Sequence, residues 1–350
     1  MVAWLLVRLG KAVLATWGIA SIVFLLSRLA ADQPDEQLFD QANLLNQSAT
    51  PAALAASNLA LRQRLGLQEP VFYVTRSAAG WQWHGEYNQY QAWLNQLLHG
   101  NLGQSFRDGQ AVTAQLKPAL ACTLPLMGLA LGLATGLALL LAVYLAGGPP
   151  ATGGRSAIYA GLAAVQSLPL FVLGLLLLLL LANPAVLNIL PEADLASYQA
   201  GPGGPQELAA YAVRLVLPVA ALVLSALPEL TLPLAAALSH ELTDTYATAA
   251  HAKGLSTSQV LWRHALPNAV LPLLVTFTGL LPALVAGSVV VEVLFALPGM
   301  GRLLADAAAA HDYPVLVAGV LVAAWARLLA LLAADIVQYY LDPRLRAAGV

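Results

Sequence analysis

The stretch TYATAAHAKGLSTSQVLWRHALP, residues 245–267, decides how the rest of this sequence is organised. It is a polar segment between long apolar runs, and it predicts two short helices separated by a break. Residues 246–253 are rich in alanine, the strongest helix former, and Gly254 stands where glycine commonly ends a helix. Ser256 with Gln259 three residues later matches a capping box, which starts a second helix. A helix-turn-helix of this kind between two membrane spans is well shaped to dock a partner protein.

The composition is that of a membrane protein. Charged residues make up 10% and hydrophobic residues 59% of the 350 residues, which is far from the composition of an ordinary soluble domain. The net charge of −2 leaves no basic surface for nucleic acid. Cys122 is the only cysteine, so an intrachain disulfide is excluded, and we expect it to be a small apolar residue inside a helix.

Six apolar segments are long enough to cross about 30 Å of hydrocarbon as helices. They cover residues 12–30, 121–146, 156–182, 211–237, 269–297 and 315–341. Arg8 and Lys11 precede the first segment as they would in a signal peptide, but no small-residue cleavage site follows, so we expect a retained span. Most basic residues of the short loops fall on one side of a six-span arrangement, which places both termini in the cytoplasm. The fold expected is an all-α integral membrane protein with about six transmembrane helices.

A long non-membrane stretch, residues 32–118, separates the first two spans and is expected on the outer side of the membrane. Its helical spacing predicts a helix over residues 54–65. Residues 71–75 and 81–87 predict a pair of β-strands, because they are rich in β-formers and a small-residue turn separates them. We expect this stretch to form a small extracytoplasmic cap rather than an independent enzyme domain.

The spans contain residues that modify helix packing. Gly128, Gly132 and Gly136 are four apart in the second span, a spacing that lets helices approach closely. That face packs either within this chain or against a second subunit. Five prolines fall within or beside spans four and five, and they either only shape the helices or kink them around a translocation cavity. These are Pro218, Pro228, Pro233, Pro272 and Pro282.

Four ionisable residues lie at membrane depth, where such groups are costly and are candidates for function. They are Glu229 in span four, Glu292 near the outer end of span five, and Arg327 and Asp335 in span six. Arg327 and Asp335 are eight residues apart and therefore share a helix face. Two interpretations stay open for this set: buried pairing that fixes helix packing, or the lining of a translocation path.

No enzyme motif is complete in this sequence. HELTD at residues 240–244 begins like the HExxH of zinc proteases, but Asp replaces the second histidine. GGPPATGG at residues 147–154 lacks the G-K-[ST] ending of a phosphate loop. His84 and His99 lack the tight spacing of metal ligands. We therefore expect no catalytic residue, no cofactor and no metal site.

A resemblance to a known family rests first on the opening stretch. Ala249-Ala250, followed by Gly254 and then by HALP at residues 264–267, resembles the EAA loop of ABC-transporter permease subunits. YATAAHAKGLS and RHALPNA are similar to the dipeptide/oligopeptide (and nickel) branch of binding-protein-dependent permeases. Thr248 replaces the acidic residue of the general motif, and His251 stands where that branch commonly has arginine.

The resemblance extends over most of the chain. Further matching stretches lie at residues 65–70 (LGLQEP), 89–112, 289–308, 311–315 (HDYPV) and 341–346 (LDPRLR). Relative to the family pattern, the residues around 71–86 look inserted.

The resemblance implies a permease subunit of an ATP-driven ABC importer in a bacterial-type inner membrane. Such a subunit forms a translocation path for peptides or a similar small solute, with an identical or different second permease subunit. It implies two cytoplasmic ATPase subunits and an extracytoplasmic solute-binding protein, so that ATP hydrolysis comes from partners and this chain is not an enzyme. Residues 1–350 would form one permease domain, and residues 240–268 its cytoplasmic coupling loop.

In this interpretation the ATPase contacts come from one set of residues in the coupling loop. They are Tyr246, Thr248, Ala249, Ala250, His251, Lys253, Gly254, Leu255, Leu266 and Pro267. A self-contained secondary transporter or channel is the main alternative, and it requires internal repeats with broken helices at matching positions. No convincing repeat is found. A membrane-bound assembly factor is the third hypothesis.

Overall fold

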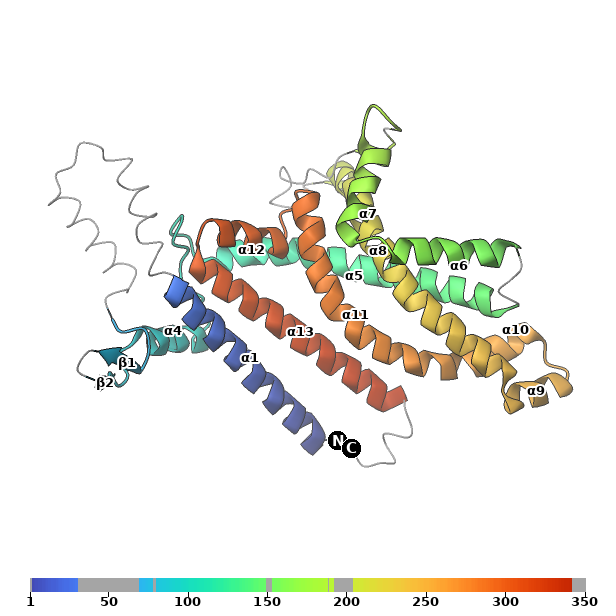
Figure 1. Ribbon diagram of the computed structural model, residues 1–350, viewed down its shortest axis with the longest axis horizontal. Helices are drawn as coiled ribbons and strands as arrows, with labels where there is room; N and C mark the ends of the chain where they lie inside the picture. Colours follow the sequence, from blue (N-terminus) through green and yellow to red (C-terminus); the bar gives the residue numbers. More distant parts are fainter. Residues whose placement is uncertain are drawn as a thin grey trace. The chain divides into compact units, whose positions relative to one another are not determined.

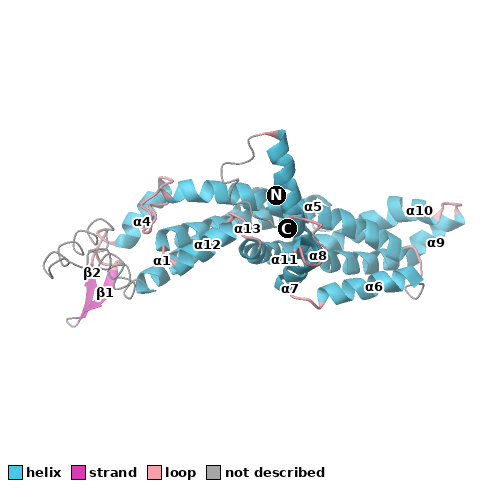
Figure 2. Ribbon diagram, turned by 90° about the horizontal axis from the view of Figure 1, so that it is seen from above, coloured by secondary structure: helices cyan, strands magenta, loops and turns pink. Residues whose placement is uncertain are grey.

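A computed structural model of the chain describes residues 2–30, 69–77, 80–148, 153–187, 189–191 and 204–341. Two compact units divide the chain. The first combines Met1–Leu9, Pro118–Leu303 and Ala326–Val350, and the second combines Gly10–Lys117 and Leu304–Trp325. Helices make up most of the described residues, together with one short β-hairpin (Figure 2).

Long apolar helices form where the sequence predicts membrane spans. Their bounds are α1 Val2–Ala30, α5 Val112–Ala146, α8 Pro205–Thr243, α11 Leu266–Leu294 and α13 Tyr313–Leu341 (Figure 1). In the described chain, α1, α5, α8 and α13 are each long and apolar enough to cross a membrane. The mostly helical membrane fold is therefore confirmed, while the count of six spans stays a prediction.

The third expected span, residues 156–182, differs from a continuous helix. It consists of α6 (Gly153–Gln166), α7 (Leu170–Leu177) and a π-helical turn, η1 (Leu178–Ala182), and the helix axis bends by 108° between α6 and the rest. Pro169 lies directly before α7 and has a non-helical ψ of 145°. Proline also disfavours the helical conformation of the residue before it, so the helix is interrupted here. Counted as one span, this broken pair brings the described total to as many as five.

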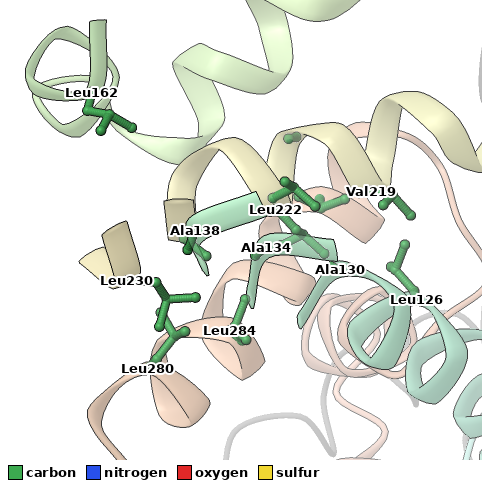
Figure 3. Close-up of a cluster of buried hydrophobic side chains, with 14 of the residues drawn as sticks. Leu126, Ala130, Ala134, Ala138, Leu162, Val219, Leu222, Leu230, Leu280 and Leu284 are labelled. Carbon is green, nitrogen blue, oxygen red and sulfur yellow. The ribbon is translucent and has the colours of Figure 1, made fainter. Parts of the chain in front are cut away.

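A large hydrophobic core joins the helices of the first unit. Ala130, Ala134 and Ala138 of α5 are buried and belong to one cluster with Leu222 of α8 and Leu284 of α11 (Figure 3). Residues four apart lie on one face of a helix, and alanine lets neighbouring helices approach closely. The alanine face of α5 therefore makes the contacts with the other helices of this unit.

The glycine face of α5 is free of such contacts. A Cβ atom added to Gly128, Gly132 or Gly136 would meet no described atom within 4 Å. Among the described residues, no other helix packs closely against this glycine face, so the first alternative, packing within the chain, is not seen.

The second unit carries the hairpin and the helix α4 (Gln89–Leu98). Strands β1 (Val74–Ser77) and β2 (Gly80–Trp83) pair antiparallel, with Val74 opposite Trp83. A hairpin is thus confirmed, although its strands are shorter and closer together than residues 71–75 and 81–87. The helix expected over residues 54–65 lies outside the described residues.

Aromatic rings attach α4 to α1 in the second unit. The ring of Phe24 stacks on Trp93 at 4.9 Å and meets Tyr90 edge-on at 5.5 Å. The hydroxyls of Ser21 and Tyr90 are hydrogen-bonded at 2.7 Å. Because aromatic pairs stabilise beyond their buried area, these contacts fix the C-terminal half of α1 against α4.

Candidate functional site: the coupling loop and the outer turn

The first helix of the coupling loop forms as the sequence predicts. Helix α8 ends at Thr243, and α9 (Thr245–Ala252) follows, with the carboxylate of Asp244 accepting from the backbone N–H of Thr245 at 2.6 Å. Gly254 has a φ of +87°, a left-handed conformation that glycine adopts without steric cost. The predicted break at Gly254 is confirmed.

The second helix begins with the predicted capping box. Gln259 N donates to Ser256 Oγ at 3.3 Å, and Ser256 N donates to the Gln259 side chain at 2.9 Å. Helix α10 (Thr257–Val260) follows and passes through a π-helical turn, η3 (Leu261–Ala265), into α11. Helix α11 begins at Leu266 with Pro267 in its first turn, and the chain stays helical across this boundary. The wide π-turn before Pro267 accommodates the missing N–H of proline.

A small buried cluster holds the two halves of the loop together. Ala247 and Val260 are fully buried, Ala250 is also buried, and Tyr246 and Leu255 pack against them. The loop therefore has its own packed interior across the break at Gly254. Small side chains at positions 247 and 250 allow this close approach.

A polar contact ties the loop to both neighbouring helices. The Tyr246 hydroxyl donates to Glu241 Oε2 at 2.6 Å, and the Asn268 side-chain amide donates to the same oxygen at 3.3 Å. Burial, followed by the hydrogen bond to the Glu241 carboxylate, raises the pKa of Tyr246 to about 12. Tyr246 is therefore a neutral donor near pH 7. Glu241 and Asn268 are absent from the candidate set, although Asn268 lies in the RHALPNA stretch.

The remaining candidates divide by exposure. Thr248, Ala249, His251, Lys253 and Pro267 are exposed, and Leu255 and Leu266 are half-buried. The His251 ring is bonded through Nδ1 to the carbonyl of Leu255 at 3.1 Å, across the break. Trp262, outside the candidate set, is 47% exposed. Both departures from the family pattern, Thr248 and His251, thus lie on the surface.

A second organised region lies at the end of α11, where Glu292 is 0% exposed. Its carboxylate accepts from Thr123 Oγ1 at 2.7 Å, from Gly301 N at 2.6 Å and from Arg302 N at 3.3 Å. Thr123 in turn accepts from Met300 N at 2.8 Å. All these residues belong to the first unit, and we call residues 296–302 the outer turn.

The sequence ALPGMGR suits the outer turn because side chains would obstruct it. A Cβ added to Gly299 would collide with the Glu292 carboxylate, and one added to Gly301 would collide with the backbone of Val289. Helix α12 (Met300–Ala309) starts directly beside that carboxylate. A negative charge at a helix N-terminus is favourable, so Glu292 stabilises both the turn and the start of α12.

The four ionisable candidates lie in different surroundings. Glu229 in α8 and Arg327 in α13 are exposed, whereas Glu292 is enclosed by the outer turn. The side chain of Asp335 lies outside the described residues. A shared face for Arg327 and Asp335 and a translocation path lined by this set stay predictions.

Two motif stretches that are far apart in sequence meet in the second unit. The carboxylate of Asp312, in HDYPV, accepts from the Ser105 hydroxyl and from Phe106 N at 3.0 Å. Ser105 and Asp312 are each only 4% exposed. Both stretches match the family pattern in the sequence, but the contact between them appears only in the structure.

Comparison with known proteins identifies the class. Residues 138–347 match the sequence model of the family described as "Binding-protein-dependent transport system inner membrane component". The match covers more than half of the chain, so the chain belongs to this family. It is an inner-membrane, multi-pass permease subunit of a binding-protein-dependent transport system, and a transport component rather than an enzyme.

Several characterised permeases are similar over nearly the whole chain. The di/tripeptide transport system permease DppB of Pseudomonas aeruginosa is 28% identical over 365 residues, covering 99% of both chains. The oligopeptide transport system permease AppB of Bacillus subtilis is 27% identical over 349 residues, with 99% of both chains covered. The dipeptide permease DppB of Lactococcus lactis is 28% identical over 348 residues, covering 99% of this chain and 100% of its own. The resemblance stated from the motifs is confirmed.

Proposed function

We propose that this chain, with a second permease subunit, forms the path by which an ATP-driven importer carries short peptides or similar small solutes. The relatives named above are peptide permeases, and they align with this chain from end to end. The family description supplies dependence on a binding protein, and such systems imply ATPase partners. A lone secondary transporter or an assembly factor does not fit this membership.

The coupling loop, residues 240–268, is the proposed contact with the ATPase. The observation that carries this proposal is the combination of an exposed face (Thr248, Ala249, His251 and Lys253) with a packed, braced interior. A docking element needs both, because a force applied to a loose loop would be absorbed locally. The Tyr246–Glu241–Asn268 contact connects α9 to the end of α8 and to the start of α11.

Motion of the loop would reach the membrane through a continuous helical connection. From α10 the chain runs through η3 into α11 with no intervening coil. ATPase closure that displaces α9 therefore displaces α11, provided that the ATPase binds the two positions of the loop with different affinity. A π-turn is a common place for such a helix to bend.

The proposed topology follows the charge pattern of the loops. Residues 240–268 and both termini face the cytoplasm, residues 32–118 form the outer cap, and about six spans of one domain connect them. The outer turn and the cap would face the binding protein. Glu229, Arg327 and Asp335 stay the candidates for the path, and the burial of Glu292 favours a role in holding the outer turn. The open glycine face of α5 suits contact with the second permease subunit.

Reconstitution tests the proposal directly. The chain would be combined in proteoliposomes with a second permease, the ATPase subunits and the binding protein, and uptake of labelled trialanine would be measured. We expect uptake that requires ATP and stops when any one component is omitted. Uptake by this chain alone, driven by an ion gradient without ATP, would overturn the proposal in favour of a secondary transporter.

A further inference from the structure

A cavity of about 540 Å³ lies within the second unit, and all of its lining residues belong to that unit. This volume falls in the range of small-molecule sites, which is about 300–1,000 Å³. Its wall includes four aromatic residues and four side-chain amides, and the charged lining residues are Arg28, Arg107 and Asp108. The cavity is large enough to hold a small solute.

Arg28 is the unusual residue of this cavity. It lies in the last turn of α1, two residues beyond the apolar window that ends at Leu26. Its guanidinium group lies over the rings of Phe24 at 5.2 Å and Phe106 at 5.9 Å. Nη1 is buried and has no hydrogen-bond partner among the described residues. The two rings stabilise the guanidinium cation from its faces, but they do not hydrogen-bond the N–H groups of Nη1. Leaving such a donor of a buried charged group unpaired is energetically costly.

An unsatisfied acceptor lines the same cavity. Gln89 is 7% exposed, and its side-chain Nε2 donates to the carbonyl of Glu69 at 2.6 Å. That bond fixes the orientation of the amide and leaves Oε1, which is buried, without a partner in the described chain. Unpaired buried polar atoms are uncommon, and among the described residues two that line this cavity carry one each, a donor on Arg28 and an acceptor on Gln89.

The wall around Arg28 is held in place before any ligand binds. The Asp312 carboxylate accepts from Ser105 and from Phe106 N, which fixes the segment carrying the Phe106 ring. Backbone N–H groups of Arg107 and Asp108 donate to Ser105 Oγ at 3.2 and 3.3 Å. A rigid wall lowers the entropic cost of binding.

Charge in the cavity favours an anion. Among the described residues of the lining, Asp108 is the only acidic one, and its carboxylate already accepts from the Gln115 side chain at 3.0 and 3.1 Å. Two arginines and one aspartate give the lining a net charge of +1 (2 − 1 = 1). A guanidinium group recognises carboxylate with paired, charge-assisted hydrogen bonds.

We propose that this cavity binds the carboxylate end of a small solute, with Arg28 holding the carboxylate and Gln89 Oε1 accepting from an adjacent N–H. A peptide C-terminus offers this combination, since its carboxylate lies next to a backbone amide. Phe24 and Trp93 supply apolar wall for its last side chain. The choice of a peptide rests on the proposed function, whereas the anion-binding chemistry rests on the cavity alone.

The test compares matched probes on the full-length chain in phosphatidylcholine nanodiscs. Trialanine and trialanine amide differ only in the C-terminal charge, and their affinities would be measured by calorimetry. Arg28→Gln removes the cation, Arg28→Lys keeps the charge without the planar fork, and Lys117→Gln removes an exposed charge outside the cavity as the control. Membrane yield and thermal unfolding would confirm that each variant folds.

We expect the wild-type chain and Lys117→Gln to bind trialanine about tenfold or more tightly than the amide. Arg28→Gln should bind both probes equally weakly, and Arg28→Lys should fall between. Equal binding of the two probes by the wild-type chain would overturn the proposal. Binding of neither probe would also overturn it and would indicate that the cavity holds only water. Loss of trialanine binding when phosphatidylglycerol is added would instead assign the site to an anionic lipid headgroup.

The inference and the proposed function can fail separately. If the assembled transporter imports no peptide, the proposed function fails whatever the cavity binds. If it imports trialanine with unchanged rate and KM when it carries Arg28→Gln, and the acid and amide bind equally, then only the cavity proposal fails.

Discussion

Replacement of Glu292 should strongly destabilise the outer turn. Its two oxygens accept three hydrogen bonds in a site that is 0% exposed. Glu292→Ala leaves the Thr123 hydroxyl and the Gly301 N–H buried without an acceptor. Each such group costs about 1–3 kcal/mol, so the two together should lower the free energy of unfolding by about 2–6 kcal/mol.

Glu292→Gln is a milder variant of the same experiment. The amide oxygen of the introduced glutamine would still accept from Gly301 N, and its NH₂ group would donate to Thr123 Oγ1. The Thr123 hydroxyl would keep accepting from Met300 N but would lose the acceptor for its own hydrogen. We therefore expect a loss of about 1–2 kcal/mol. The order wild type, Gln, Ala follows from the number of buried donors that keep an acceptor.

Cys122 provides the assay, because it is the only cysteine and is buried next to Thr123. The rate at which a fluorescent maleimide labels Cys122 during slow heating reports the opening of this region. Glu229→Gln, an exposed carboxylate in the same unit, is the control. If Glu292→Ala unfolds and labels at the wild-type temperature, the assigned role of the carboxylate is refuted.

Two further predictions concern the coupling loop. Tyr246→Phe removes the hydrogen bond to Glu241 and should lower the free energy of unfolding by about 1 kcal/mol and reduce ATP-dependent uptake. The pKa of Tyr246 is raised from 10.0 to about 12, so the stabilising effect of this bond is complete below pH 10 and is lost only as the pH rises through 12. The difference in Tm between variant and wild type should therefore be the same at pH 7 and pH 9, and a difference that shrinks over this range would contradict the prediction. Gly254→Ala places a Cβ at a φ of +87° and should lower the free energy of unfolding by about 1 kcal/mol and lower uptake, whereas the control Gly161→Ala, in the open middle of α6, should change neither stability nor uptake. Gly254→Asp should abolish uptake while the protein remains in the membrane. Normal transport by Gly254→Asp would count against the docking role of the loop.

Local features of the fold could be predicted because their causes lie within a few residues. The capping box of Ser256 with Gln259 and the left-handed Gly254 depend on neighbours in the sequence, and both form as expected. Long apolar runs identify membrane helices for the same reason. The bend near Pro169 had a local signal too, a proline within an apolar run, but its angle depends on tertiary packing.

The contacts around Glu292 and around Asp312 could not be predicted, because they join distant residues. Thr123 and Glu292 are 169 residues apart, and Ser105 and Asp312 are 207 apart. At sequence level Glu292 is only an ionisable residue at membrane depth, which is why it was placed among the candidates for the path. Its three donors become visible only when α5 and the outer turn are brought together.

We propose above all that residues 240–268 dock on the ATPase from the cytoplasmic side. The most direct measurement is site-specific cross-linking in the reconstituted transporter, with a cysteine introduced at Lys253 in the exposed loop or, as the control, at Arg107 in the cap. We predict that a short bifunctional maleimide–amine reagent joins position 253 to the ATPase, with a yield that changes when ATP binds, and that position 107 gives no such product. Cross-linking of the ATPase from position 107, or none from position 253 in an assembled and active complex, would contradict the account.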